Sequence, residues 1–153
     1  MGYLFRLLPE KHIAINLDVK SKRRVFDQAG LMFEKSLKIG REHIFQAFLE
    51  REKMGSTALG NSVAIPHGRL QKLQKSTGAF IRTKNGIPFE APDNKHVSLF
   101  FFLLVPTQAN ELHLQILSEL AQLFSSRTVH KILSESNDLG ELSEVFSNWE
   151  KYA

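Results

Sequence analysis

Cysteine is absent from this chain, which excludes disulfides, thiolate nucleophiles and cysteine-ligated zinc sites. Long apolar runs are absent too. The longest, Leu99 to Val105, has seven residues, whereas a membrane-spanning helix needs about 20. The first ten residues, MGYLFRLLPE, are interrupted by Arg6 and Pro9, so they do not form the apolar core of a secretory signal peptide. We therefore expect a cytoplasmic protein without membrane insertion.

The composition that remains is that of an ordinary globular protein. Of 153 residues, 42% are hydrophobic and 24% are charged, close to the usual mix for folded domains. This length corresponds to one domain and is sufficient to bury a core without disulfides or metals. The net charge of +4 is too modest to indicate nucleic acid binding by itself. We expect a single compact domain over residues 1–153.

Apolar residues recur at the spacing of an amphipathic helix in several segments. These predicted helices cover residues 21–37, 41–53, 110–124, 127–134 and 138–150. Ser21 is suited to be the N-cap of the first helix. Asp138 and Glu141 have the spacing of a capping box at the last one.

The segments between these helices predict strands. Residues 77–83, TGAFIRT, fit a strand, and Asn85-Gly86 is a turn signal that would make a hairpin with residues from Ile87 onward. Pro88 limits the second arm of that hairpin. Residues 97–105, VSLFFFLLV, lack alternation, as in a central strand covered on both faces. Helices before and after the strands imply a sheet packed between helices.

His67 has the most distinctive setting of the six histidines. The sequence Ala64-Ile65-Pro66-His67-Gly68 places it after a short apolar strand that Pro66 is expected to end. Pro66 fixes the backbone before it, and Gly68 has no side chain, so another molecule could approach the imidazole. Such a histidine suits a nucleophile or proton carrier, while an ordinary turn histidine is the alternative. The other candidates, His12, His43, His96 and His130, have no distinctive local setting and are interpreted as surface or packing residues.

Two further residues stand out because they lie on apolar helix stripes. Arg51 follows Phe48 by three residues, so its guanidinium is expected to face inward toward an anion. Its alternative role is to satisfy the last carbonyls of its helix. His113 precedes Ile116 by three residues and lies near its helix start, where the helix dipole disfavours a charged imidazole. A neutral His113 could donate a hydrogen bond to an anion, or could simply be a satisfied core histidine.

Motifs of several other function classes are missing. The chain contains no HExxH, no GxSxG and no GxxxxGK[ST] sequence, so a zinc hydrolase, a serine hydrolase of that type and a phosphate-loop nucleotide site are not indicated. We expect neither a cofactor nor a metal. A basic cluster at Lys20, Lys22, Arg23 and Arg24 would be the basis for a nucleic acid binder. It lacks interleaved aromatic residues, and we interpret it as a solvated helix start.

The segment GSTALGNSVAIPHGRL resembles the signature of the type-2 (fructose/mannitol class) enzyme IIA domains of the bacterial phosphoenolpyruvate-dependent phosphotransferase system. The fuller run FLEREKMGSTALGNSVAIPHGRL is most similar to the nitrogen-regulatory (PtsN-type) enzyme IIA. A later run, FFLLVPTQANELHLQILSELAQLFS, also matches, so the resemblance covers nearly the whole chain. It implies an α/β fold with a mixed parallel and antiparallel sheet packed between helices.

The resemblance also implies roles for individual residues. His67 would accept a phosphoryl group on Nε2 from a histidine phosphocarrier protein. Arg51 would pair with the phosphoryl oxygens, and His113 would lie beside the acceptor, where it would orient it or donate a hydrogen bond. Additional phosphate-loop candidates in the motif are Ser56, Thr57 and Asn61. One position departs from the family, which usually has glycine where this chain has Ala58. If that position needed a positive φ, alanine would cost about 1 kcal/mol.

For the biological output, the resemblance implies a regulatory protein whose phosphorylation state changes its binding to other proteins. Potassium transport and sensor-kinase systems are the expected classes of target. The alternative within the family is a sugar-specific enzyme IIA that passes its phosphoryl group to a transporter enzyme IIB. A phosphotransferase with either output would use the same histidine.

Overall fold

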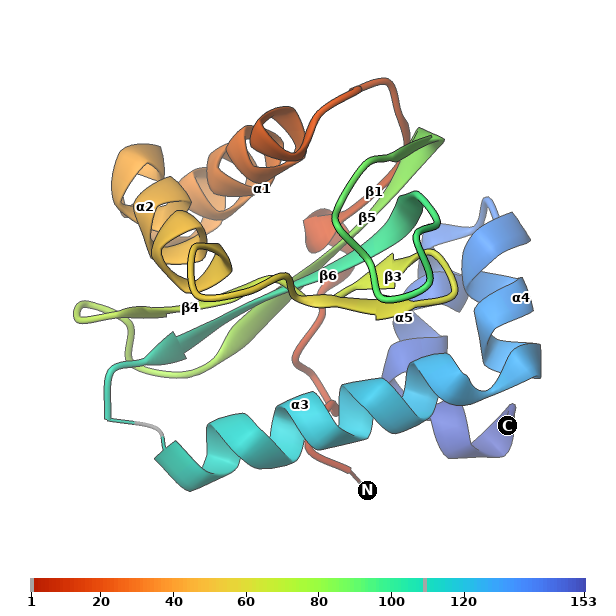
Figure 1. The fold of residues 1–153 in the computed structure, drawn as a ribbon. Coiled ribbons are helices and arrows are strands. Elements are labelled where there is room, and N and C mark those ends of the chain that lie inside the picture. Colours follow the sequence, from red (N-terminus) through yellow and green to blue (C-terminus); the bar gives the residue numbers. More distant parts are fainter. Residues whose placement is uncertain (1, 109) are drawn as a thin grey trace.

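A mixed six-stranded sheet forms the centre of the fold in the computed structural model, which describes residues 2–108 and 110–153 (Figure 1). Its strands are β1 (Ile13–Leu17), β2 (Ala58–Gly60), β3 (Val63–Ala64), β4 (His67–Leu70), β5 (Thr77–Ile87) and β6 (Val97–Pro106). The order is β1-β5-β6-β3-β2. Strand β4 also pairs with β6, along the part of β6 that follows its pairing with β3. Strands β1 and β5 are parallel, as are β3 and β4 with β6, whereas β5 with β6 and β2 with β3 are antiparallel. The predicted fold class is confirmed.

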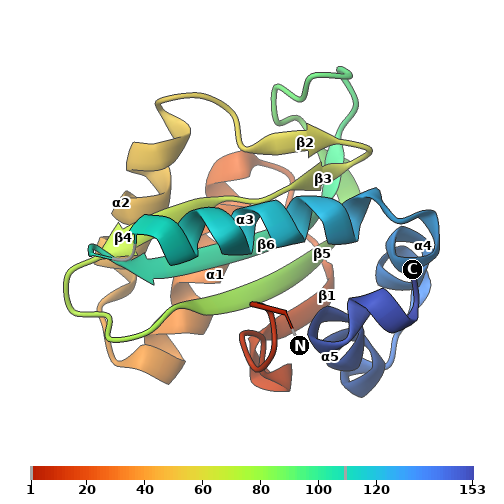
Figure 2. The same ribbon diagram turned by 90° about the horizontal axis from the view of Figure 1, so that it is seen from below.

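Helices cover both faces of this sheet (Figures 1 and 2). They are α1 (Lys22–Leu37), α2 (Arg41–Glu52), α3 (Asn110–Ser125), α4 (Arg127–Glu135) and α5 (Leu139–Ser147), with short 3-10 turns η1 (Glu10–His12) and η2 (Trp149–Lys151). Helices α1 and α2 lie on one face, and α3 runs across the other, followed by α4 and α5. The predicted N-cap at Ser21 is confirmed, since Ser21 accepts from Arg24 N. Asp138 likewise accepts from Glu141 N, but its own N–H donates to Ser136 Oγ, so the predicted capping box is only half formed.

Strand β6 separates two hydrophobic cores. Alternate residues such as Phe101 and Leu103 pack with the C-terminal helices, while Phe100 and Phe102 pack with α1 and α2. Each of these side chains is fully buried, because a strand presents successive side chains to opposite faces. The prediction of a central strand without alternation is therefore confirmed.

One prediction about the strands is wrong, and one strand was missed. The turn expected at Asn85-Gly86 does not form, because β5 continues through it to Ile87 and pairs with β6 across an irregularity. Gly86 instead allows close approach between strands, since a Cβ there would lie 2.7 Å from His96 Cβ. Strand β1 was not predicted at all. Its parallel pairing with β5 is a tertiary contact that five residues cannot reveal.

The single domain predicted for residues 1–153 includes Met1 and Ala109, which lie outside the described residues. The basic cluster at the start of α1 is partly engaged in the fold rather than free. Lys22 Nζ lies 2.9 Å from Glu52 Oε2 and 4.1 Å from the centre of the Phe89 ring. No helix formed by the described residues has the length and apolar character needed to cross a membrane.

Candidate functional site

His67 begins a strand rather than ending one. The pairing of β3 with β6 stops at Ala64, opposite Phe100, and β4 resumes it with His67 opposite Leu103. Between the two strands, Pro66 still accepts a hydrogen bond from Leu103 N at 2.9 Å through its carbonyl. The strand expected to end at Pro66 is thus only interrupted there. The interruption fixes His67 at a break in the sheet, next to a strand that is buried on both faces.

The hydrogen bonds of the His67 imidazole assign its protonation state. Nδ1 lies 2.9 Å from the carbonyl oxygen of Ile65, and because a carbonyl only accepts, Nδ1 carries the proton. On the other side, Arg51 Nε donates to Nε2 at 3.2 Å. Nε2 is therefore the nitrogen with the free electron pair. Burial lowers the pKa of His67 below 6.5, and the Arg51 charge acts in the same direction, which keeps this pair available at neutral pH.

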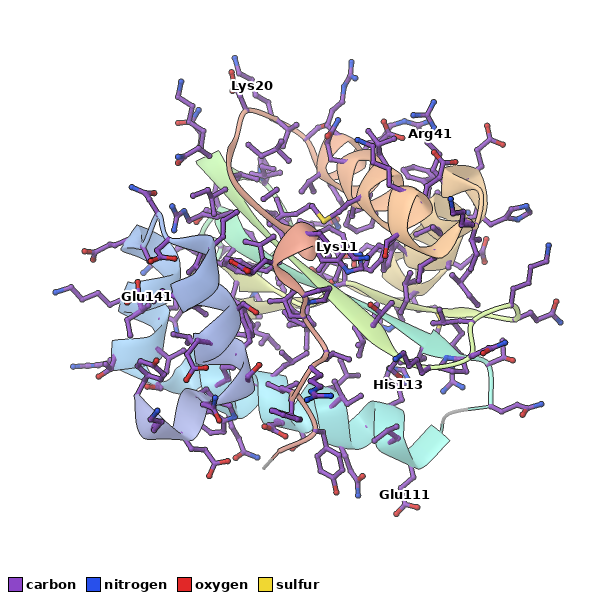
Figure 3. The ribbon with its side chains drawn as sticks, turned by 180° about the vertical axis from the view of Figure 1, so that it is seen from behind. Lys11, Lys20, Arg41, Glu111, His113 and Glu141 are labelled. Atoms are coloured by element: carbon purple, nitrogen blue, oxygen red, sulfur yellow. The ribbon has the colours of Figure 1, made fainter. Side chains whose placement is uncertain are left out.

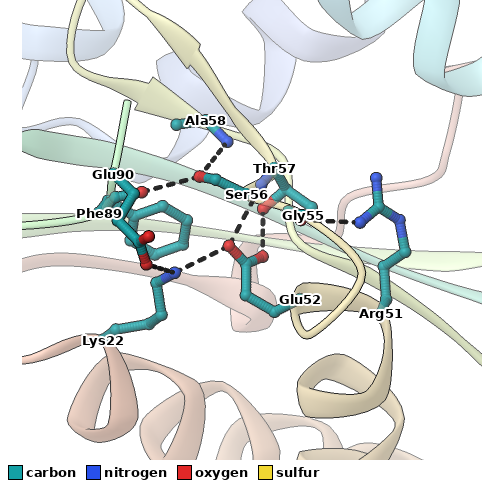
Figure 4. A network of polar contacts seen from close by, with 9 residues as sticks. All are labelled: Lys22, Arg51, Glu52, Gly55, Ser56, Thr57, Ala58, Phe89 and Glu90. Atoms are coloured by element: carbon teal, nitrogen blue, oxygen red, sulfur yellow. Dashed lines mark hydrogen bonds and ion pairs between the residues drawn. The ribbon is translucent and has the colours of Figure 1, made fainter. Parts of the chain in front are cut away.

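Arg51 reaches the imidazole from the last turn of α2. Besides His67, its Nη1 donates to the Gly55 carbonyl oxygen at 2.9 Å (Figure 4). The inward direction predicted from the apolar stripe is therefore observed, whereas the carbonyl that Arg51 contacts is that of Gly55 in the loop after α2 and not one of the last helix carbonyls. The Gly55 contact anchors one arm of the guanidinium and directs its Nε–H at His67.

His113 lies beside His67 on the opposite side from the Arg51 helix. It projects from the first turn of α3 toward the sheet, whereas Glu111 on the same helix projects away (Figure 3). The two imidazole rings are 5.1 Å apart at an interplanar angle of 70°. Burial lowers the pKa of His113 to about 4, with contributions from the charges of His67, Arg69 and Arg51. His113 is therefore neutral at physiological pH, as predicted.

Sequence reasoning did not identify Arg69. It lies two residues after His67 on β4, and residues at this spacing share one face of a strand. Its Nη2 lies 3.4 Å from His113 Nδ1, and its Nη1 donates to the Thr107 carbonyl oxygen at 2.8 Å. Because a guanidinium only donates, His113 Nδ1 accepts and Nε2 carries the proton. That Nε2 is buried and has no partner among the described residues, so its N–H is not used by the fold itself.

His67 is less exposed than predicted. Only 8% of the residue is exposed. Gly68 does not leave space for an incoming molecule, because a Cβ there would lie 2.9 Å from the backbone carbon and oxygen of Ala47 on α2. This glycine lets α2 approach β4, and that approach brings Arg51 to His67. The prediction that Gly68 serves access is wrong.

The three loop candidates make contacts away from His67. Ser56 Oγ donates to the Phe89 carbonyl oxygen at 2.7 Å, and Thr57 Oγ1 donates to Glu52 Oε1 at 2.7 Å (Figure 4). Asn61 N donates to Asp93 Oδ2 at 2.9 Å, in a turn where Asn61 has a positive φ. The buried Glu52 carboxylate also accepts from Lys22 and from Thr57 N. These contacts hold the loop in place directly after the Arg51 helix.

Ala58 causes no strain at its position. It lies at the start of β2, paired with Ala64, and it is not among the described residues with positive φ, a set that includes its neighbours Gly55 and Gly60. The cost of about 1 kcal/mol for a left-handed alanine therefore does not arise.

Chemically, the site combines a fixed neutral imidazole, a guanidinium at its nucleophilic nitrogen, and a second neutral imidazole with a free N–H. A lone pair beside cationic and neutral donors suits attack on an anionic electrophile. In the part of the chain that the structure describes, no group of three or more His, Asp or Glu side chains is arranged to hold a metal ion.

Comparisons with known proteins identify relatives of this chain. A family model described as "Phosphoenolpyruvate-dependent sugar phosphotransferase system, EIIA 2" matches residues 6–149. The nitrogen regulatory protein of Escherichia coli (strain K12) is 36% identical over 132 residues, 86% of this chain and 81% of that protein. The fructose-specific EIIABC component of Bacillus subtilis (strain 168) is 30% identical over 146 residues, 95% of this chain but 23% of that protein.

Among solved structures, nitrogen regulatory protein IIA-Ntr from Neisseria meningitidis is 43% identical with a TM-score of 0.88. The match covers 92% of this chain and 96% of the other. Sequence and fold thus agree over a range that contains Arg51, His67 and His113. The chain belongs to the EIIA type-2 family of the phosphoenolpyruvate-dependent phosphotransferase system and is a phosphocarrier component of such a system.

Proposed function

We propose that His67 accepts a phosphoryl group on Nε2 from a phosphohistidine of a histidine phosphocarrier protein. The Nε2 electron pair forms the new N–P bond while the donor N–P bond breaks, and that bond's electron pair returns to the donor imidazole. The proton on His67 Nδ1 stays in place, where it donates to Ile65. The observation that carries this proposal is the pair of hydrogen bonds that leaves the lone pair on Nε2.

Arg51 and His113 would stabilise the transferred group. As phosphorus approaches Nε2, the Arg51 guanidinium moves from the lone pair to the phosphoryl oxygens, for which its planar geometry is suited. The unpartnered Nε2–H of His113 donates to another phosphoryl oxygen, and Arg69 holds His113 in the tautomer that does so. Transfer between two histidines exchanges similar bonds, so alignment and charge stabilisation are the main requirements. Ser56, Thr57 and Asn61 would support the loop around the site.

The donor would dock on an apolar rim around these residues. Met54 follows Arg51 by three residues and is 81% exposed, while Leu112 and Leu114 flank His113 and are 43% and 67% exposed. Exposed apolar side chains of this kind mark protein interaction surfaces. Because His67 itself is largely covered, the rim must bring the donor phosphohistidine directly to Nε2.

The proposed output is regulatory. A phosphoryl group adds about two negative charges at neutral pH, placed at the centre of the rim, which is enough to reverse a protein contact. The relatives named nitrogen regulatory proteins favour this output, with potassium transport or sensor-kinase systems as the class of target. Similarity to the fructose-specific EIIABC component supports the alternative of transfer to a transporter enzyme IIB.

Labelling with phosphoenolpyruvate, enzyme I and the cognate phosphocarrier tests the acceptor. The wild-type chain should take up one phosphoryl group. His67→Asn should take up none, because asparagine keeps a donor for Ile65 but removes Nε2. His43→Asn changes an exposed histidine and should label normally. Unchanged labelling of His67→Asn would refute the assignment.

A second experiment tests the output. Pull-downs with the phosphorylated and unphosphorylated chain should recover different partners, or the same partners with different affinity. Identical partners at identical affinity would contradict a regulatory switch. Transfer of the label to a purified enzyme IIB at a rate comparable with its uptake would favour the transporter alternative.

A further inference from the structure

A second basic site lies away from His67, in a cavity of about 870 Å³. Its walls are the N-terminal segment from Arg6 through the η1 turn, the C-terminal end of α1 and the loop of residues 71–76 between β4 and β5. Figure 3 labels Lys11 in η1, on the face seen from behind. The cationic side chains that line the cavity are Arg6, Lys11, Lys72 and Lys75, and its lining contains no carboxylate.

These four cations are not neutralised within the fold. None of them lies within 4 Å of a carboxylate among residues 2–108 and 110–153, whereas Lys22, Lys53 and Lys151 do. Like charges around one cavity repel one another, and an anion with two or more charges would remove that repulsion. The cavity is therefore electrostatically suited to a phosphate-bearing ligand.

Two buried polar atoms in the same lining have no hydrogen-bond partner in the described chain. They are His12 Nε2 and Ser76 Oγ. His12 is only 2% exposed, and its Nδ1 lies 2.9 Å from the Gly78 carbonyl oxygen, so Nδ1 carries the proton. Burial lowers the pKa of His12, which leaves Nε2 as an acceptor. Leaving such atoms unpaired is unfavourable, and a ligand hydroxyl that reaches them would satisfy them.

We propose that this cavity binds a small phosphorylated hydroxy compound. Its phosphate contacts the four cations, and a hydroxyl donates to His12 Nε2 and pairs with Ser76 Oγ. The volume is within the range of about 300–1,000 Å³ that small-molecule sites occupy. This site is independent of phosphoryl transfer at His67, so either proposal can fail without the other.

The test is a titration of the ¹⁵N-labelled chain followed by NMR, with glycerol 2-phosphate, inorganic phosphate and glycerol as probes. Glycerol 2-phosphate should bind saturably, with shifts at residues 72–77 and at the His12 imidazole. Loss of the hydroxyl contact should make inorganic phosphate bind about 5-fold more weakly, and glycerol should not bind. Absence of saturable shifts with both phosphates would overturn the proposal, and equal affinity for the two would overturn the hydroxyl contact.

Variants separate this site from general attraction to a basic surface. The double variant Lys72→Gln/Lys75→Gln should weaken glycerol 2-phosphate binding about 10-fold. Lys20→Gln/Lys84→Gln removes the same charge from exposed positions elsewhere and should leave binding unchanged, so equal losses in the two double variants would overturn the site. Phosphatidic acid vesicles present the same phosphate group on a lipid. Binding of those vesicles alone, dependent on Lys72 and Lys75, would overturn the assignment to a free small molecule.

Discussion

His67 and His12 are two buried histidines with the same local hydrogen bond and different surroundings. In each, Nδ1 lies 2.9 Å from a backbone carbonyl oxygen, that of Ile65 or that of Gly78. Burial lowers both pKa values. Both rings therefore present an unprotonated Nε2. At His67 that atom meets Arg51, while at His12 it has no partner in the described chain and the ring packs against Phe33.

Under the proposed function, this difference means that a fixed tautomer alone is not sufficient for phosphoryl transfer. A backbone carbonyl prepares the lone pair equally well at either place. What differs is what Nε2 contacts. At His67 it contacts the Arg51 cation, which can move from the lone pair to an incoming phosphoryl group. At His12 it is an acceptor without a partner in the described chain. The first arrangement suits transfer and the second suits binding.

Removing Arg51 would make the two imidazoles more alike. We expect Arg51→Gln to lower the rate of His67 phosphorylation about 100-fold, the usual cost of losing one donor to developing charge. Rapid-quench labelling with the phosphorylated carrier measures this rate. Arg41→Gln changes an arginine at the other end of α2 and should leave the rate unchanged. Equal rates for Arg51→Gln and the wild type would show that Arg51 has no role in transfer.

Moving α2 tests the same contact through packing. Gly68→Ala would place a Cβ 2.9 Å from the Ala47 backbone, so α2 must shift and take Arg51 with it. We expect a loss of about 1–3 kcal/mol in the free energy of unfolding, measured by urea denaturation, together with slower phosphorylation. At Gly40 an added Cβ has its nearest neighbour at 3.5 Å, so Gly40→Ala should cost less than about 1 kcal/mol. Similar losses in both variants would contradict the packing role of Gly68.

Stability should fall as the pH falls below 6.5. Unfolded histidines bind protons in that range, while His12, His67 and His113, whose pKa values are lowered in the fold, stay neutral to lower pH, about 4 for His113. The unfolded state then binds more protons, so acid favours unfolding and this contribution vanishes above pH 6.5. For His113→Gln we expect the pH-dependent loss between pH 7 and 4.5 to shrink by on the order of 2 kcal/mol.

The control for this pH dependence is His43→Asn, in which an exposed histidine is replaced. Its unfolding free energy, measured by urea denaturation at each pH, should fall in parallel with that of the wild type. A slope for His113→Gln that equals the wild-type slope would contradict the neutral state of His113 in the fold.

Local periodicity was sufficient to predict most of the fold. The helices follow from apolar residues at helical spacing, because each helix buries one stripe. The strand β6 follows from its uninterrupted apolar run, because it is buried on both faces. Strand β1 and the continuation of β5 through Gly86 could not be predicted, since they depend on pairing with distant strands. Pro66 was expected to end a strand, but β6 provides partners on both sides of the interruption.

The placement of site residues could be predicted where helical spacing determines the direction of a side chain. The inward positions of Arg51 and His113 follow from their apolar stripes. The role of Gly68 was misjudged because its neighbour, Ala47, lies on a different element. Arg69 could have been found from its i+2 position on the strand of His67, but nothing local indicated that this strand continued beyond Pro66. The chemical setting of His12 depends on Gly78, a contact across 66 residues, and no local pattern reveals it.

The central claim is that the phosphoryl group is carried on Nε2 of His67 while Nδ1 keeps its proton. NMR of the phosphorylated, ¹⁵N-histidine-labelled chain tests this most directly, through the coupling between phosphorus and the imidazole nitrogens. We predict one phosphohistidine, with phosphorus coupled to Nε2 of His67 and a proton retained on Nδ1. Phosphorus on Nδ1, or on a histidine other than His67, would contradict the account.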